Sequence, residues 1–590
     1  MTSKNLYPTI KPSLDLNFAR SKTLDPKVTF TRSSTASYYD GKTVAKAEEN
    51  LLTYSEQFDN WAKQYVAVSQ NAGVAPNGTS TAVHIVPTAS AVPHGVTQSI
   101  KVVVGQTYTL SVYAKAGAYD RLIVCDNWYG VYNALFSLSS GTVVSSTGCT
   151  GSITSVGNGW YRCVIQFTPA TYTDNTPAFI IAPSTASGYN FTADGVSGGY
   201  LWGAQLEQRS SVTAYTPTTS APITNYLPAL QYAASNVPRF DHDPITGESK
   251  GLLIEEARTN LLTYSEQFDN AAWVKSYASV TSDTAVSPSG TLTADKLVES
   301  AATGGHLIRQ SGTASSASTS ITVYAKAGER QYLQLGAGVT SQQYANFNLV
   351  NGSIAAVGSD ATATMVGVGN GWYRCSIAVR SISSGTALFI GVVNSSSAAW
   401  QQSYTGNGTS GIYIWGAQLE AGAFPTSYIP TTTAQVTRAA DSASMTGVNF
   451  SSWYRQDEGT VFAETGSTKG IFPVSYAFFG EGMLRLDKYS VGATESTAHE
   501  LRYTGNGATV IFSALPSSTR KSVATYKSND FAFIGDTSSL VTASAGKINS
   551  MSSLCIGADS TNARQPNTHI KRITYYPKRL TDAQLQALTV

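Results

Sequence analysis

The chain has 590 residues, which is too long for a single hydrophobic core and suggests about four domains. Charged residues make up 13%, roughly half of the ~25% usual in globular domains, and the formal net charge is +2. This charge gives no electrostatic basis for binding nucleic acid or an anionic membrane surface. With 42% hydrophobic residues the chain can still bury cores, which argues against extended disorder.

The first stretch, MTSKNLYPTIKPSLDLNFARSK, has no apolar segment typical of a secretory signal. No apolar run approaches the ~20 residues that a membrane-spanning helix needs. We therefore expect a protein that is made in a cytoplasm without a signal peptide and is not inserted into a membrane. Five cysteines form no CxxC pair, and Cys163 and Cys375 occupy predicted strands, so we expect buried free thiols there.

Residues 1–49 are interpreted as an N-terminal arm followed by a hairpin. The stretches VTFTRSSTASYY and KTVAKA flank Asp40-Gly41, a dipeptide that favours the positive φ angles of a type I′ turn. A piece of this size cannot form a core of its own. We expect it to pack on the module that follows or on a partner.

A duplication covers most of the chain after residue 49. NLLTYSEQFDN at 50–60 returns letter for letter at 260–270, and VGNGWYRC at 156–163 returns at 368–375. VYAKAG, WGAQLE and the AYTPTT/SYIPTT pair return in the same order. Repetition of this kind indicates two copies of one domain. We assign them as module 1 (residues 50–220) and module 2 (residues 260–433).

Each module is predicted to consist of short strands joined by turns. SIKVVVGQTYTLSVYAKAG contains two strands around Gly105-Gln106, and GWYRCVIQF and GGYLWGAQLE give further strands rich in aromatic and β-branched residues. ALFSLSSGTVVS and its counterpart NFNLVNGSIAAV predict hairpins. Regularly spaced strands with turns between them favour a β-sandwich or jelly roll for each module.

Two further regions complete the chain. Residues 221–259 begin as a proline-rich linker and continue as a hairpin around Asp243-Pro244-Ile245-Thr246-Gly247. Residues 434–590 carry a different set of short alternating strands, among them EGTVFAETG, KSVATYKSND and HIKRITYYPKRL. The predicted fold is therefore all-β throughout.

One short helix is predicted at the C-terminal end. Thr581 is placed to cap it with Gln584 at the third helical position, which gives a capping box. Leu580 and Leu585 occupy the positions of a hydrophobic staple. We expect this helix to be structural.

Several stretches resemble known families. PRFDHDPITGESKGLLIEEARTNLLTYSEQFDNAAW, with the later YIWGAQLEAG and SYIPTT, resembles a pattern of tailed-phage virion proteins. Each module resembles the jelly-roll carbohydrate-binding modules attached to xylanases, and the strands ending in IKRITYYPKRLTDAQLQAL resemble concanavalin A-like (laminin G-like) sandwiches. The resemblances imply a virion subunit of the tail-fibre, tail-associated or head-spike type, with tandem jelly rolls and a C-terminal concanavalin A-like sandwich.

The xylanase-linked modules often hold a structural calcium, so the resemblance raises the question of calcium here. They use a carboxylate just after the opening NLL…F and an aspartate in the closing strand. Asp59 and Asp269 match the first position, but the closing strand reads WGAQLE, without the aspartate. Because calcium takes about six to eight oxygen ligands, the missing carboxylate argues against the site.

A binding site is best sought where the two copies differ. Residues kept in both, such as Trp160, Tyr161, Arg162 and Trp202, are interpreted as packing residues of the shared scaffold. Module 1 alone reads DNWYGVYN at 126–133, whose aromatic residues have no counterpart at their own positions in module 2. Aromatic rings stack on sugar C–H patches, and amides and carboxylates bind vicinal hydroxyls. We predict a glycan site formed by Asp126, Asn127, Trp128, Tyr129 and Tyr132. A tyrosine-rich protein contact would use the same side chains.

The sequence shows no recognisable catalytic constellation. Glycosidases on concanavalin-like sandwiches place acids as ExDxxE, whereas Glu458 and Glu464 here lack the middle acid. Asp241-His242-Asp243 is interpreted as a solvated turn beside Pro244. The chain has no GxSxG, HExxH or phosphate-binding loop. We expect no enzymatic activity and no cofactor other than the calcium considered above.

Together these features predict a phage fibre or spike protein that adheres to host-surface polysaccharide and contacts other virion proteins. Homo-oligomerisation is expected, with a trimer favoured by analogy with fibres. Two alternatives stay open. One is a purely architectural decoration or collar protein without receptor binding, and the other is a polysaccharide depolymerase.

Overall fold

The computed structural model describes most of the chain, and almost all of its regular structure is strand. The described ranges are 7–127, 131–171, 173–312, 318–337, 342–380, 387–466, 474–479, 484–490, 497–502, 504–505, 508–509, 521–536, 539–544, 550–558, 565 and 567–590. Within them no helix is long and apolar enough to cross a membrane. The prediction of two jelly rolls, a C-terminal concanavalin A-like sandwich and a short terminal helix is confirmed.

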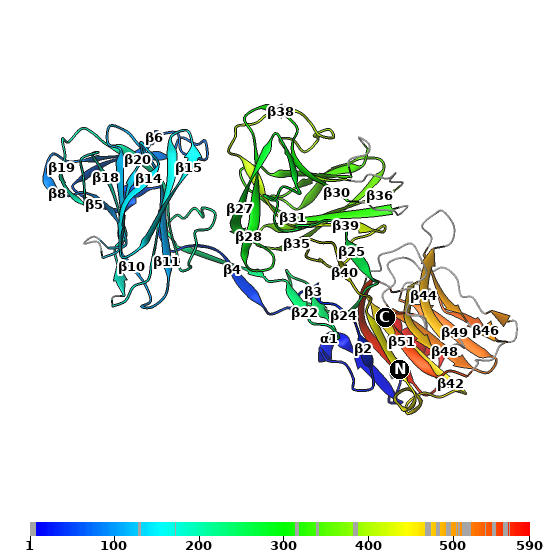
Figure 1. Ribbon diagram of the computed structural model, residues 1–590. Helices are drawn as coiled ribbons and strands as arrows, with labels where there is room; N and C mark the ends of the chain where they lie inside the picture. Colours follow the sequence, from blue (N-terminus) through cyan, green and yellow to red (C-terminus); the bar gives the residue numbers. More distant parts are fainter. Residues whose placement is uncertain are drawn as a thin grey trace, which may run out of the picture.

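Module 1 is a sandwich of two six-stranded antiparallel sheets (Figure 1). One sheet has the order β15-β16-β11-β20-β7-β6 and the other the order β14-β13-β12-β18-β9-β5. The bounds are β5 (Ala62–Gln64), β6 (Val66–Gly73), β7 (Ala82–Pro87), β9 (Gly95–Thr97), β11 (Tyr108–Lys115), β12 (Arg121–Cys125), β13 (Asn133–Ser137), β14 (Thr142–Thr147), β15 (Thr150–Gly157), β16 (Trp160–Phe167), β18 (Ala178–Ala182) and β20 (Gly199–Glu207).

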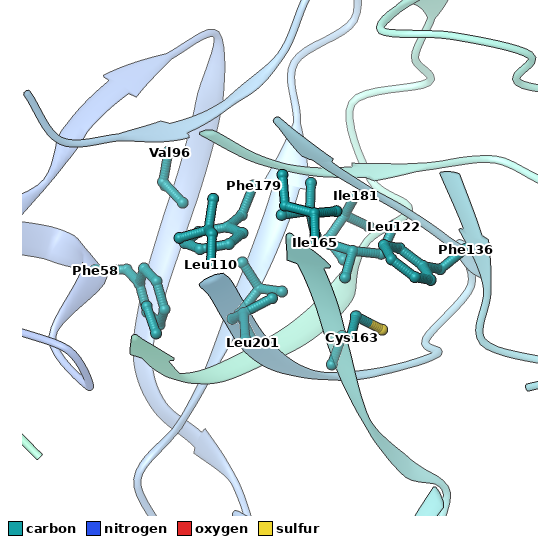
Figure 2. Packing of buried hydrophobic residues seen from close by; sticks show 14 of the residues in the cluster. Phe58, Val96, Leu110, Leu122, Phe136, Cys163, Ile165, Phe179, Ile181 and Leu201 are labelled. Carbon is teal, nitrogen blue, oxygen red and sulfur yellow. The ribbon is translucent and has the colours of Figure 1, made fainter. Parts of the chain in front are cut away.

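The core of module 1 lies between these two sheets. Leu110 and Ile165 come from the first sheet, and Leu122, Phe179 and others from the second, and these four are fully inaccessible (Figure 2). Alternation explains the placement, because every second residue of a strand points to the same face. In β11, Tyr108, Leu110, Val112 and Ala114 belong to this core, so the alternation predicted from the sequence is confirmed.

Module 2 repeats this arrangement strand for strand. Its sheets have the orders β35-β36-β31-β39-β28-β27 and β34-β33-β32-β37-β30-β26. The predicted β13–β14 and β33–β34 hairpins are both present. The bounds are β26 (Val274–Ser276), β27 (Ala278–Val286), β28 (Leu292–Glu299), β30 (His306–Ser311), β31 (Ser318–Ala327), β32 (Tyr332–Gly336), β33 (Tyr344–Asn348), β34 (Ser353–Val357), β35 (Ala361–Gly369), β36 (Trp372–Arg380), β37 (Ala387–Val393) and β39 (Gly411–Ala421).

Small two-stranded pairings accompany the main sheets. They are β8 (Ala91–Pro93) with β19 (Asn190–Thr192), β10 (Ile100–Lys101) with β17 (Asp174–Asn175) and β29 (Thr303–Gly304) with β38 (Tyr404–Thr405). The two strands predicted around Gly105-Gln106 are therefore present, but β10 pairs with β17 instead of β11. Cys163 and Cys375 are free and fully buried, as expected.

The last sandwich is assembled from distant parts of the chain. One sheet has the order β23-β24-β52-β42-β48-β49-β50, with β1 also paired to β52, and the other has the order β2-β41-β51-β43-β44-β45. The bounds are β1 (Leu14–Asn17), β2 (Thr29–Thr31), β23 (Phe240–His242), β24 (Ser249–Ile254), β41 (Ser442–Thr446), β42 (Glu458–Thr465), β43 (Val474–Phe479), β44 (Leu484–Ser490), β45 (Thr497–Arg502), β48 (Lys521–Lys527), β49 (Asp530–Gly535), β50 (Val541–Ala543), β51 (Ser553–Ile556) and β52 (Thr568–Tyr576).

This assembly corrects the interpretation of residues 1–49 and 221–259 as separate pieces. β1 pairs with β52 and β2 with β41, so the arm packs on the last sandwich and not on module 1. The predicted hairpin β23–β24 is present, and β24 pairs with β52 in the same sheet. β1, near the start of the described chain, and β52, near its end, therefore lie side by side in this sandwich. The reason is apolar burial, because Leu14, Leu16 and Leu252 share one core with Ile573.

The parts of the chain outside the two modules are here called the frame. Each module is inserted into the frame and is joined to it by a two-stranded ribbon. β4 (Val44–Asn50) pairs with β21 (Ile223–Pro228) around module 1, and β25 (Arg258–Asn260) pairs with β40 (Val436–Arg438) around module 2. β3 (Ala36–Tyr38) pairs with β22 (Gln231–Ala233). The predicted hairpin across Asp40-Gly41 is therefore wrong. The Asp40 carboxylate instead accepts hydrogen bonds from Thr43 and from the Lys42 N–H, which turns the chain between β3 and β4.

The helix α3 (Asp582–Thr589) ends the chain as predicted. The Thr581 side chain accepts from the Gln584 N–H, and the Gln584 side chain accepts from the Thr581 N–H. Leu580 and Leu585 are buried in one apolar cluster. The two other α-helical segments in the described ranges, α1 (Phe18–Ser21) and α2 (Val448–Ser451), are single turns.

Candidate functional site

The duplicated NLLTYSEQFDN stretch is a scaffold element in both modules. Asn50 is inaccessible, and its Nδ2 donates to the carbonyls of Ala204 and Thr216, both at 2.9 Å. Asn260 is equally buried and makes the matching bonds to Ala417 and Ile429. One asparagine thus joins the opening segment to the closing strand and to the segment after it. Because each module needs these hydrogen bonds, both copies keep the motif.

The β12–β13 connection of module 1 contains the predicted glycan-binding residues. Asp126 follows β12 directly and is fully buried. Its N–H donates to the Tyr132 carbonyl at 3.0 Å, and its Oδ1 accepts from the Tyr132 N–H at 2.9 Å. Its Oδ2 accepts from Asn175 at 3.3 Å. The bonds between Asp126 and Tyr132 join the two ends of the β12–β13 connection.

This geometry corrects the role predicted for Asp126. Asp126 cannot bind a sugar hydroxyl as an exposed carboxylate, because burial has turned it into a positioning residue for the loop. Tyr132 is half-buried and stacks on Phe167, with ring centroids 5.7 Å apart. Asn127 is half-buried at the start of the loop. Trp128 and Tyr129 lie outside the described residues, so their part in a site stays a prediction.

Module 2 has no carboxylate at the start of the corresponding connection, where Ala337 follows β32. The Ala337 N–H donates to the Gln343 carbonyl at 3.0 Å, which repeats the backbone bond of module 1. Ala337 stands where module 1 has Asp126, so the carboxylate brace belongs to module 1 alone. The backbone bond at the loop base is therefore common to both copies, and module 1, whose sequence carries Trp128 and Tyr129, adds the Asp126 carboxylate to it.

The outer face of the sheet containing β11 or β31 carries a cluster of aromatic side chains in each module. They include Tyr113, Trp160, Trp202 and Tyr215 in module 1, and Tyr324, Trp372, Trp415 and Tyr428 in module 2. The interpretation of the shared tryptophans as packing residues is confirmed, because all of them are at least 96% buried. In module 2 this face also packs against Tyr39 and Leu230 of the frame. The chain itself covers the face in module 2.

Module 1 leaves the same face more accessible. Tyr113 and Tyr215 are half-buried, whereas Tyr324 and Tyr428 are each 2% exposed. Contacts between the modules include a hydrogen bond from the Ala214 N–H to the Thr284 carbonyl at 2.9 Å. Lys326 of module 2 also forms an ion pair with Glu48 in β4, the strand that leads into module 1. Module 2 therefore packs against the frame through its aromatic face, whereas the same face of module 1 is more exposed to solvent.

The candidate calcium ligands differ in their surroundings. Asp59 is exposed, and its Oδ1 accepts from Gln70 at 2.5 Å. Asp269 is exposed in module 2, where its charge acts on buried Asp295. Among the described residues no group of three His, Cys, Asp or Glu side chains is arranged to hold a metal ion. A calcium site at Asp59 or Asp269 stays a prediction that the geometry does not strengthen.

Asp295 is an acid buried where module 1 has an apolar side chain. It pairs with Ile414 in the ladder position where Val83 pairs with Leu201 in module 1. Its oxygens accept from the N–H groups of Phe268 and Asp283 at 2.9 and 3.0 Å. Burial raises the pKa of Asp295 to about 7, and the charges of Asp269 and Asp283 act in the same direction.

The Asp241-His242-Asp243 stretch is not the solvated turn that the sequence predicts. Asp241 and His242 belong to β23, and the turn begins only at Asp243. Asp241 Oδ2 lies 2.7 Å from His569 Nε2, and Oδ1 accepts from the Tyr39 N–H. Burial opposes ionisation of Asp241, but the hydrogen bond and charge of His569 hold its pKa below the usual value. The pair joins the linker to the last strand.

One further cluster escaped the sequence interpretation. On the outer face of module 2, Trp400 lies beside Tyr344, with ring centroids 5.8 Å apart. The underlying strands carry Gln334 and Asn346 where module 1 has Ile123 and Leu135. The exchange of two apolar residues for two amides is visible in the sequence when β32 and β33 are compared with their module 1 counterparts position by position. The prediction looked only for aromatic residues gained by module 1.

No family model and no curated protein matches the chain. Among solved structures, the crystal structure of the LG1-3 region of the laminin alpha2 chain is similar to it at 9% sequence identity. That match covers 83% of this chain and 97% of the other, with a TM-score of 0.15. A score this low carries no argument, and the sandwich architecture rests on the strand pairings themselves.

Proposed function

We propose that this chain is a structural subunit of a tailed-phage particle that adheres to host-surface glycans through module 1. The phage assignment rests on the resemblance of residues 238–273 and 413–432 to virion proteins. The adhesive role rests on the loop between Asp126 and Tyr132. Weak single contacts of this kind gain strength when many copies bind together, and a homotrimer would supply them.

The observation that carries the adhesive role is the brace at the base of the loop. Module 1 places a buried carboxylate, Asp126, at the base of this connection, and module 2 has Ala337 at the same position. Pre-organising a loop lowers the entropy lost when it binds a ligand. A carboxylate brace in the copy whose sequence carries Trp128 and Tyr129 fits a binding loop better than a connection that serves only the fold.

The arrangement of the domains supports the same role. Module 1 lies at the opposite end of the molecule from the sandwich that holds both chain ends (Figure 1). Module 2 lies between them and is fixed to the frame through its aromatic face. An adhesin of this shape would attach through the terminal sandwich and present module 1.

The test uses the full-length chain on an array of bacterial surface polysaccharides. We expect Trp128→Ala with Tyr129→Ala to weaken binding at least tenfold. Val196→Ala is the matched control, since Val196 is 79% exposed elsewhere in module 1. Binding that is unchanged in the double variant would show that the loop is not the adhesive site.

A purely architectural role is the second candidate, and the buried ion pairs that Asp441 makes with Arg32 and Arg239 favour it, because they join distant segments of the chain. Under that role the chain would bind particle proteins but no polysaccharide from any susceptible host. Release of oligosaccharide from capsule or lipopolysaccharide would instead indicate a depolymerase. Mass measurement in solution decides whether the chain is a trimer.

A further inference from the structure

Trp400 lies in a loop on the outer face of module 2. Hydrogen bonds attach this loop to the sheet on both sides of Trp400. Gln334 Oε1 accepts from the Gln401 N–H at 2.8 Å, and Gln334 Nε2 donates to the Ala399 carbonyl at 3.0 Å. Asn346 Nδ2 donates to the carbonyls of Ser396 and Ala398 at 3.1 and 2.7 Å. The backbone that carries Trp400 is therefore fixed by two side chains of the sheet beneath it.

Burying the side-chain amides of Gln334 and Asn346 costs free energy, and the sandwich fold does not require amides at these two positions. Gln334 is 3% exposed and Asn346 is inaccessible, and they face each other across β32 and β33. In module 1 the same cross-strand pair is Ile123 with Leu135, which belong to an apolar cluster. Apolar side chains can thus cover this face. Buried amides are tolerated only with their hydrogen bonds made, so their presence in module 2 serves the loop.

The loop presents an aromatic group. Trp400 is half-buried between Tyr344 and Phe389, whose ring centroids lie 5.8 and 5.4 Å from its own. Gly336 makes room for it, because a Cβ at that position would meet the Trp400 ring at 1.9 Å. Module 1 has Cys125, Asn133 and Ala178 where module 2 has Gly336, Tyr344 and Phe389. Tyr344 and Phe389 are therefore specific to module 2, whereas in module 1 Tyr189 and Phe191 pack on the equivalent face.

A cation lies next to this group. Arg309 is exposed, and its guanidinium lies 5.9 Å from the centre of the Phe389 ring. Within the described residues, no carboxylate makes an ion pair with Arg309, whereas Arg330 of module 2 pairs with Glu299 and Arg374 donates to the Thr426 carbonyl. Module 1 has Thr97 at this ladder position. A guanidinium that stacks on one ring keeps its N–H fork available for a planar anion.

We propose that Trp400, Tyr344 and Arg309 form a second glycan site, on module 2, for a sugar that bears a carboxylate. The aromatic rings would stack on the C–H face of a hexuronic acid, and Arg309 would bind its carboxylate. The inference rests on the proposed adhesion to glycans but places it on residues distinct from the module 1 loop. Gln334 and Asn346 are positioning residues, since they hold the loop without contacting the sugar.

Calorimetric titration of the full-length chain with trigalacturonic acid tests the site, and neutral galactotriose serves as the matched probe. We expect measurable binding of the acidic trisaccharide and at least tenfold weaker binding of the neutral one. Trp400→Ala should weaken trigalacturonate binding about tenfold or more. Arg309→Gln should remove the preference for the acid while leaving neutral binding unchanged.

Two further variants separate positioning from stability and one module from the other. Gln334→Ile with Asn346→Leu, the pair that module 1 carries as Ile123 and Leu135, should weaken binding without lowering the melting temperature by more than the control Val350→Ala, a substitution in the exposed β33–β34 turn. Trp128→Ala with Tyr129→Ala in module 1 should leave trigalacturonate binding intact.

The outcomes distinguish this inference from the proposed function. Trigalacturonate binding that survives Trp400→Ala and Arg309→Gln overturns the module 2 site. Absence of trigalacturonate binding to the wild type also overturns it, and the module 1 loop then stands or fails by its own array experiment. Binding lost in the Trp400 and Arg309 variants but retained in the module 1 double variant supports the second site.

Discussion

The Arg32 guanidinium lies 3.0 Å from the Asp441 carboxylate, with both side chains inaccessible, although 409 residues separate them in the chain. Asp441 also pairs with Arg239 at 2.6 Å, and Arg239 pairs with Glu255 at 2.8 Å. The Ser427 hydroxyl of module 2 donates to Glu255 as well. The N-terminal arm, the linker, module 2 and the last domain thus meet in one buried network of charges. The buried charges of this network neutralise one another only when all four segments are folded together.

We expect Asp441→Asn to destabilise the last sandwich by about 3–5 kcal/mol, because it leaves two buried guanidinium groups short of a countercharge. Urea unfolding followed by circular dichroism measures the change. Lys101→Gln is the control, since Lys101 and Asp174 form an ion pair that is exposed on both sides. Such a surface pair contributes about 1 kcal/mol or less. Equal effects of the two substitutions would contradict the assigned role of the network.

Fragments of the chain should differ sharply in their ability to fold. Residues 260–433 contain both sheets of module 2 and should give a cooperative thermal transition. Residues 434–590 lack β1, β2, β23 and β24, which supply strands to both sheets of the last sandwich. We expect this fragment to lack a cooperative transition and to bind a hydrophobic dye. A folded, monomeric 434–590 fragment would show that the inserted arrangement is not needed for stability.

Asp126→Ala should loosen the β12–β13 loop, since it removes the acceptor of the Tyr132 N–H inside the module. An unsatisfied buried donor costs about 1–3 kcal/mol. Asp126→Asn is the informative control. It keeps one acceptor oxygen, and the Asn175 Oδ1, which has no hydrogen-bond partner, could accept from the new amide after a rotation of the Asn175 side chain. Hydrogen exchange of the Tyr132 amide should rise in the alanine variant and stay low in the asparagine variant.

Module 2 should lose stability between about pH 4 and pH 7 through Asp295. Burial raises the pKa of this carboxyl from 3.8 to about 7. The folded module therefore keeps a proton that the unfolded chain releases, and the stabilisation is complete below about pH 4 and gone above about pH 7. A shift of about three pKa units corresponds to about 4 kcal/mol.

Asp295→Val provides the comparison, because module 1 carries Val83 at that position. Melting temperatures of the 260–433 fragment between pH 4 and pH 8 should fall with pH in the wild type and change less in the variant. Parallel curves for both proteins would exclude Asp295 as the source of the pH dependence.

Local pattern was enough to predict much of the fold. Alternation along β11 and β31 indicated strands, the Thr581–Gln584 spacing indicated the capped helix, and the exact repeat at 50–60 and 260–270 gave two equal modules. These features depend on residues within one or two turns of each other, or on direct comparison of the copies. The duplication also indicated that Trp160 and Trp202 pack inside, because a scaffold side chain is needed in each copy.

Pairing partners and side-chain exposure were decided only by the tertiary structure. A short alternating strand such as Leu14–Asn17 fits the edge of any sheet, and nothing near it specifies β52 more than 550 residues later. Asp126 looks like a surface ligand in sequence, yet three hydrogen bonds and a fully buried position make it a brace. Sequence fixes which residues alternate and repeat, because that chemistry is local. Which strand completes which sheet depends on the apolar surface that the whole chain buries together.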